Sequence, residues 1–147
     1  MKNYFNVSRY KELLKQRKNE EISFLNLELI SFEASVEEQI CYDRKKDYFI
    51  LIDEYLSRTI SLYDFRSKFL QMQNEDSEKA TIILEDFQEL ENFTLANNLE
   101  KFSDLITDIS SLCFEYGELW DGTIEPMSES EFYDLVNNYY FQLKNFK

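Results

Sequence analysis

Glycine and proline are almost absent from this chain, which has two Gly and one Pro among its 147 residues. The tight turns of a multi-stranded sheet usually need residues that tolerate a positive φ, and Gly supplies most of them. A chain with so few turn residues is therefore expected to fold into helices. Its length is typical of a single domain that can bury a core without disulfide bonds or metal ions.

Apolar residues recur at the three- and four-residue spacing of a helical face along most of the sequence. The most regular stripe predicts a central helix and consists of Leu99, Phe102, Ile106, Ile109, Cys113 and Tyr116. Another stripe predicts a helix nearer the N-terminus and consists of Ile22, Leu25, Leu29, Phe32, Val36 and Ile40. In that segment the alternation of Leu25, Leu27 and Leu29 leaves a short strand as an alternative.

Further helices are indicated by similar stripes and by signals for where a helix begins. One helix is expected from about Asp43 to Arg58. Ser61 with Asp64, and Ser128 with Glu131, have the spacing of a capping box, in which the Ser hydroxyl accepts from a free backbone N–H. The polar run NEDSEK, residues 74–79, predicts a turn between two helices. The last helix is expected to bury Phe132, Leu135, Val136, Tyr139 and Leu143.

Together these patterns predict an all-α fold, an antiparallel helical bundle of four to six helices joined by short connections. We expect residues 1–42 to form an N-terminal helical extension and residues 43–147 to form the main acidic bundle, within one compact unit. Cys41 and Cys113 lie in apolar stretches and are expected to be structural thiols in a reducing compartment. The N-terminus has no continuous apolar run, so we expect a cytoplasmic location, or the interior of an organelle.

The charge of the chain is strongly acidic and unevenly distributed. Sixteen basic residues against 29 acidic ones leave a net charge of −13, and there is no His. Such a charge repels nucleic acid and anionic lipid, so the natural partner is a basic protein, with no direct nucleic acid or membrane binding. Nine acids and no Lys or Arg lie between Phe102 and Leu143, whereas residues 1–20 carry six bases and two acids, a local net of +4.

The segment around the only Trp is the strongest candidate for a partner-binding surface. Its candidate residues are Glu115, Tyr116, Glu118, Trp120, Asp121 and Glu125. Trp and Tyr are common anchors in interfaces, and a charged rim steers the partner toward them. Two alternatives stay open: the acids only solvate the surface, and Trp120 closes the end of the bundle. The basic N-terminal segment could also fold back and neutralise part of the acidic field.

Catalysis is not expected from this composition. Without His, the commonest general base is missing and Ser-His or Cys-His nucleophilic sites are excluded. No Gly-rich phosphate loop or dinucleotide fingerprint occurs. Carboxylate pairs three residues apart, such as Asp86 with Glu89, leave a carboxylate-rich metal-dependent enzyme as the least favoured hypothesis. We therefore expect a non-enzyme with no cofactor and no metal.

Several stretches resemble the small helical immunity proteins of the colicin D immunity type. They are YFILIDEYLSRTISLYDFRSKFLQMQ, then CFEYGE at the end of the long central helix, and SESEFYDLVNNYYFQL at the close. The resemblance covers residues 43–146, and residues 1–42 have no counterpart in it. It implies a four-helix bundle that inhibits a cognate basic ribonuclease toxin, a tRNA-cleaving one in the best-known case, by covering its active cleft and mimicking the charge of the substrate.

A second hypothesis about function needs no toxin. The chain is rich in Lys, Asn, Phe and Tyr and poor in Ala and Gly, as expected for an A+T-rich genome. It could thus be a helical adaptor or structural protein of an organelle, a plasmid or a low-GC bacterium. Its many aromatic residues could fill one core or leave a patch for self-association, so a monomer and a homodimer both stay open.

Overall fold

A computed structural model of the chain describes residues 3–19, 23–118 and 127–145. The structure is 82% helical, with seven helices and one very small sheet in its described part. The predicted all-α class is confirmed. The seven helices exceed the predicted four to six because residues 7–19 form a helix of their own and a short helix follows the fourth one.

The helices are α1 (Val7–Asn19), α2 (Ser23–Asp43), α3 (Lys45–Leu56), α4 (Leu62–Leu84), α5 (Phe87–Glu91), α6 (Leu99–Glu118) and α7 (Glu129–Lys144). Two short strands, β1 (Asn3–Tyr4) and β2 (Thr94–Leu95), pair antiparallel with Asn3 opposite Leu95. The predicted helical stripe at 99–116 and the predicted helix near the N-terminus are both confirmed. The strand alternative for Leu25–Leu29 is not adopted, since these residues lie within α2.

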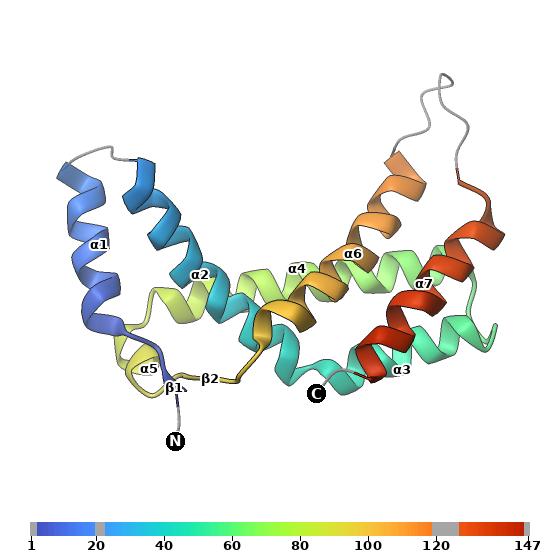
Figure 1. Cartoon of the computed structure of the whole chain (residues 1–147), viewed down its shortest axis with the longest axis horizontal. Helices are drawn as coiled ribbons and strands as arrows, with labels where there is room; N and C mark the ends of the chain where they lie inside the picture. Colours follow the sequence, from blue (N-terminus) through green and yellow to red (C-terminus); the bar gives the residue numbers. More distant parts are fainter. Residues whose placement is uncertain (1–2, 20–22, 119–126, 146–147) are drawn as a thin grey trace.

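Figure 1 shows an elongated molecule in which α2 and α6 diverge from a common middle and α4 spans most of the length. Two apolar cores lie on either side of that middle. The larger core packs α3, α6, α7 and the first half of α4 around Phe65, Phe69, Phe102 and Phe132. The smaller core packs α1, α2, α5 and the end of α4 around Tyr10, Leu29, Val36, Ile83 and Leu90. Residues from the N-terminal segment and from the end of α4 therefore share one core.

The predicted turn at residues 74–79 is wrong, because α4 continues through it without interruption. Asp76 is 1% exposed and faces the interior. Its two carboxylate oxygens accept from Arg44 Nη1 at 2.7 Å and from the Tyr48 hydroxyl at 2.5 Å. The polar residues around Asp76 form the solvent-facing side of the helix, so a composition typical of a turn belongs here to a helix held by a buried charge.

This buried carboxylate joins three elements at the middle of the molecule. Arg44 lies between α2 and α3, and its guanidinium also approaches the exposed Asp47 at 3.8 Å. Tyr48 on α3 also accepts a hydrogen bond from Gln73 Nε2 of α4 at 2.7 Å. The direction of α3 relative to α2 and α4 is therefore fixed by hydrogen bonds as well as by apolar packing.

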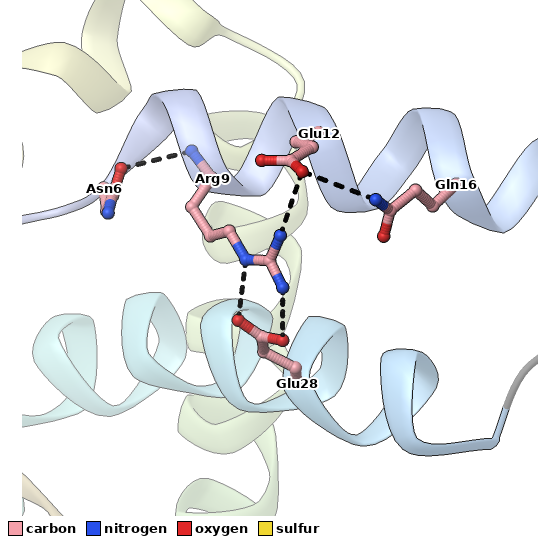
Figure 2. A network of polar contacts seen from close by, with 5 residues as sticks. All are labelled: Asn6, Arg9, Glu12, Gln16 and Glu28. Carbon is pink, nitrogen blue, oxygen red and sulfur yellow. Dashed lines mark hydrogen bonds and ion pairs between the residues drawn. The ribbon is translucent and has the colours of Figure 1, made fainter.

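The basic helix α1 packs on α2, and Figure 2 shows the contacts that hold it there. Arg9 donates through Nε and Nη2 to the two carboxylate oxygens of Glu28, each at 2.9 Å, and pairs with Glu12 at 3.2 Å. The Arg9 backbone N–H donates to Asn6 Oδ1 at 3.1 Å, near the start of the helix. One basic residue of the N-terminal segment thus compensates an acid of α2. The fold-back alternative concerned the acids between Phe102 and Leu143, and this pair does not test it.

The helix starts predicted at Ser61 and Ser128 are confirmed, since each hydroxyl accepts from the backbone N–H three residues later, at Asp64 and Glu131. In α7 the fully buried tyrosine is Tyr140, whereas the predicted Tyr139 is partly exposed. Cys41 and Cys113 are buried free thiols. None of the described helices has the length and apolar character that crossing a bilayer requires.

Replacing Asp76 by Ala should lower the free energy of unfolding by about 3 kcal/mol, because the change leaves Arg44 and Tyr48 without their buried partner. Urea denaturation followed by circular dichroism measures the loss. The control is Asp47→Ala, which removes a 64% exposed partner of the same arginine and should change stability by less than about 0.5 kcal/mol. Equal losses of unfolding free energy in the two variants would show that the buried Arg44–Asp76 pair contributes no more to stability than the exposed Arg44–Asp47 pair.

Two tyrosines on α3 should respond oppositely to losing their hydroxyl. The Tyr55 hydroxyl is buried and has no hydrogen-bond partner among the described residues, so Tyr55→Phe should stabilise the protein by up to about 1 kcal/mol. Tyr48→Phe removes bonds to Asp76 and Gln73 and should destabilise it by roughly 1–2 kcal/mol. Thermal melts of both variants test this, and destabilisation by Tyr55→Phe would contradict it.

Candidate partner-binding site

The structure describes only part of the predicted surface around the Trp. Glu115 is exposed near the end of α6. Tyr116 is partly buried, and its ring packs edge-on against Phe132 with 5.4 Å between the centroids. Glu118 is the last residue of α6. The other predicted residues, Trp120, Asp121 and Glu125, lie outside the described residues.

A hollow of about 210 Å³ lies where α2, α4 and α6 meet, at the middle of the molecule from which α2 and α6 diverge in Figure 1. α2 contributes Ala34, Glu37, Glu38 and Cys41, which repeat at the spacing of one helical face. α4 contributes Gln73 and Asp76, and α6 contributes Ser103, Ile106 and Thr107. The hollow is therefore lined by carboxylates, hydroxyls and an amide over an apolar base.

The electrostatics of the hollow are unfavourable for the protein by itself. Burial, and then the neighbouring Asp76, raise the pKa of the Glu37 carboxyl. Burial raises the pKa of the Glu38 carboxyl too, helped by Glu100 and Asp104 on α6. Both shifts mean that the folded protein resists ionisation at these positions. At neutral pH the two groups still add negative charge to a concave, partly desolvated surface.

No ion pair within the described part of the chain compensates Glu37, Glu38, Glu100 or Asp104. The sequence gives a reason, since α2 contains five acids and no Lys or Arg, and α6 contains only Lys101. Arg44 does pair with Asp76, but it does not line the hollow. We call the four carboxylates and Asp76 the central acidic cluster. It is open to positive charge from outside.

The other chemistry of the hollow is limited. Burial and the nearby Asp76 raise the pKa of the Cys41 thiol to about 12, so it stays protonated and unreactive at neutral pH. The described residues contain no group of three or more His, Cys, Asp or Glu side chains that could hold a metal ion. The arrangement suits a guanidinium or ammonium group, which would make charge-assisted hydrogen bonds to the carboxylates.

The central acidic cluster was not among the residues predicted for the site, although the sequence carries two signals for it. Asp76 lies at helical spacing with Phe65, Phe69, Ala80 and Ile83, where an apolar residue would be expected. An acid at such a position indicates a buried partner. The second signal is the absence of bases from residues 23–43. Glu100 and Asp104 are invisible as cluster members until α6 is placed against α2.

Removing charge from the hollow should stabilise the protein. Because the pKa values of Glu37 and Glu38 are raised above the ordinary 4.5, the unfolded chain releases these protons first, and stability falls as pH rises through that range. The variant Glu37→Gln/Glu38→Gln should therefore gain about 0.5 kcal/mol at neutral pH, with the gain shrinking near pH 4. Urea denaturation at both pH values measures it.

The control is Glu78→Gln/Glu91→Gln, which removes the same charge from exposed positions that do not line the hollow. A gain of the same size in the control would assign the effect to net charge and contradict the local explanation.

Comparison of the chain with protein-family models, with curated proteins and with solved structures finds no match. The resemblance to the colicin D immunity type therefore stays a prediction made from the quoted stretches.

Proposed function

We propose that this protein is a non-catalytic binding module that recognises a basic protein through the central acidic cluster. The observation that supports this most directly is the raised pKa of Glu37 and Glu38 in a concave surface where neither carboxylate has an ion-pair partner among the described residues. An arrangement that is unfavourable in the free protein becomes favourable when a partner supplies positive charge. A bound guanidinium would relieve the repulsion and form hydrogen bonds at the same time.

The whole chain strengthens this field. The net charge of −13 attracts a basic partner over a distance comparable to the Debye length, and a concave surface concentrates the field further. Association is therefore expected to be fast and to slow as salt rises. Basic residues of the chain are concentrated on α1, and Arg9 of that helix is already paired with Glu28.

The class of partner comes from the resemblance to colicin D immunity proteins. A nuclease needs a positively charged cleft to hold phosphates, so an acidic surface that fits the cleft competes with the nucleic acid. We propose that the partner is a ribonuclease toxin whose cleft is covered by this protein. The segment that contains Glu115, Tyr116 and Trp120 is the alternative contact region. Of these residues, Glu115 and Tyr116 lie at the other end of α6 from Glu100 and Asp104.

The test starts with capture of partners on the immobilised protein at low and moderate salt, about 50 and 300 mM NaCl. A basic nuclease recovered at low salt is then purified, and its cleavage of RNA is measured with and without this protein. The variant Glu37→Gln/Glu38→Gln/Asp104→Asn should weaken inhibition about tenfold or more, because three carboxylates of the contact are lost.

Two matched variants separate the explanations. Glu78→Gln/Glu85→Gln/Glu91→Gln removes the same net charge elsewhere and should weaken inhibition far less. Glu118→Gln/Asp121→Asn/Glu125→Gln tests the alternative region. If only the Glu118→Gln/Asp121→Asn/Glu125→Gln variant abolished inhibition, the contact would be assigned to residues 115–125 and not to the central acidic cluster. The proposed function is wrong if no basic protein is recovered at either salt concentration. It is also wrong if the only protein recovered is a neutral assembly that binds equally well at both concentrations. Either result would favour the adaptor hypothesis.

A further inference from the structure

A second depression of about 360 Å³ continues from the hollow along α2 and α4. Ile30, Glu33, Ala34 and Glu37 form its α2 side, and Ser77, Ala80, Thr81 and Leu84 form its α4 side. Ala34 and Glu37 line both depressions, so the two adjoin. We call the second one the α2–α4 groove. Each helix contributes positions i, i+3, i+4 and i+7, which share one helical face.

The groove exists because small side chains line the seam between the two helices. Ala34, Ser77, Ala80 and Thr81 fill little space, so the surface stays concave where larger residues would fill it. The base of the groove is apolar, and Ala80 there is buried in the smaller core. Glu33 and Glu37 stand on the α2 side, and Glu33 accepts a hydrogen bond from the Tyr10 hydroxyl at 3.2 Å.

Exposed apolar residues mark the end of the groove that lies away from the hollow. Ile30 lines it and is 58% exposed, and Leu27, one turn earlier on the same helical face, is 68% exposed. Exposed apolar side chains beside an acidic rim are the usual anatomy of an interface, in which apolar contact supplies affinity and charge selects the partner. Two copies of a chain with a net charge of −13 repel each other, so a second copy is not the expected occupant of an acidic groove.

We propose that the α2–α4 groove and the hollow together hold one amphipathic basic segment of the partner. An apolar side chain of the segment lies against Leu27, Ile30 and Ala34. An Arg or Lys farther along it enters the hollow at Glu37 and Glu38. This rests on the proposed function and deepens it, because it assigns the partner a sequence pattern as well as a charge.

The geometry of the groove fixes the spacing in that pattern. Ile30 and Glu37 are seven residues apart on α2, a rise of about 10 Å. A partner helix lying along the groove would cover that distance in two turns, with its apolar and basic residues seven positions apart. Uniformly basic surfaces, which lack the apolar residue, should bind more weakly.

Two fluorescent peptides test the proposal. The first is a helical peptide of about three turns with two Leu on one face and three Arg beginning two turns later. The second has Ser in place of both Leu, so that its charge is the same. Fluorescence anisotropy with the full-length protein measures their affinities at about 50 and 300 mM NaCl. We expect the Leu peptide to bind about tenfold more tightly at both salts.

Substitutions in the protein locate the contact. Ile30→Ser should remove most of the advantage of the Leu peptide and leave the Ser peptide unchanged. The control is Ile82→Ser, an isoleucine on α4 that is 67% exposed and does not line the groove; it should change neither affinity. Glu37→Gln/Glu38→Gln should weaken both peptides alike, because both carry the same Arg residues.

The outcomes for the two proposals are distinguishable. Equal affinities for the two peptides, both sensitive to salt, would overturn the groove proposal and leave the acidic binding module standing. Absence of binding by either peptide at low salt would overturn both. A self-association that Ile30→Ser abolishes, seen by analytical ultracentrifugation of the protein alone, would make a second copy the occupant and overturn the proposed segment.

Discussion

The bond between Arg44 and the buried Asp76 is the interaction on which the rest of the structure depends. It joins the link between α2 and α3 to the middle of α4, the helix common to both cores. A carboxylate this far from solvent is tolerated only with partners, and Arg44 and Tyr48 supply them. The pair holds the junction of α2 and α3 against the middle of α4. The Asp76 side chain at that point also lines the hollow.

The same constraint explains why acidic side chains gather where they do. Once α2 is set against α4 and α6, the helical faces that remain uncovered are those carrying Glu37 and Glu38 on one side and Glu100 and Asp104 on the other. Neither helix offers enough bases to neutralise them. The protein therefore holds carboxylates close to one another at a concave surface. Regions that are stabilised less than they could be are common where a protein meets its partner, because binding needs interactions that folding has left unsatisfied.

The sequence was sufficient for the helical class, for the central helix, and for the starts at Ser61 and Ser128, because these follow from local spacing and capping chemistry. It was insufficient at residues 74–79, where a polar composition is ambiguous between a turn and the exposed face of a helix. The partners of Asp76 that favour the helix, Arg44 and Tyr48, lie about thirty residues away in the sequence. The central acidic cluster could not be predicted from the sequence for the same reason, because it depends on residues that are distant along the chain. Its members come from helices whose relative placement is a tertiary property, whereas the acids around Trp120 are neighbours along the chain and were conspicuous.

The pairing of β1 with β2 bears on the order in which the molecule can assemble. Phe5 donates its backbone N–H to the carbonyl of Phe93 at 2.9 Å, and the backbone N–H of Ala96 donates to Gln39 Oε1 at 2.6 Å. Residues 3–5 thus find these partners only after some ninety more have been synthesised, and such non-local contacts close slowly. The smaller core and the α2–α4 groove are complete at that point, before α6 and α7 exist. On a ribosome, where folding follows the order of synthesis, the groove is therefore formed first and the hollow is added when α6 arrives.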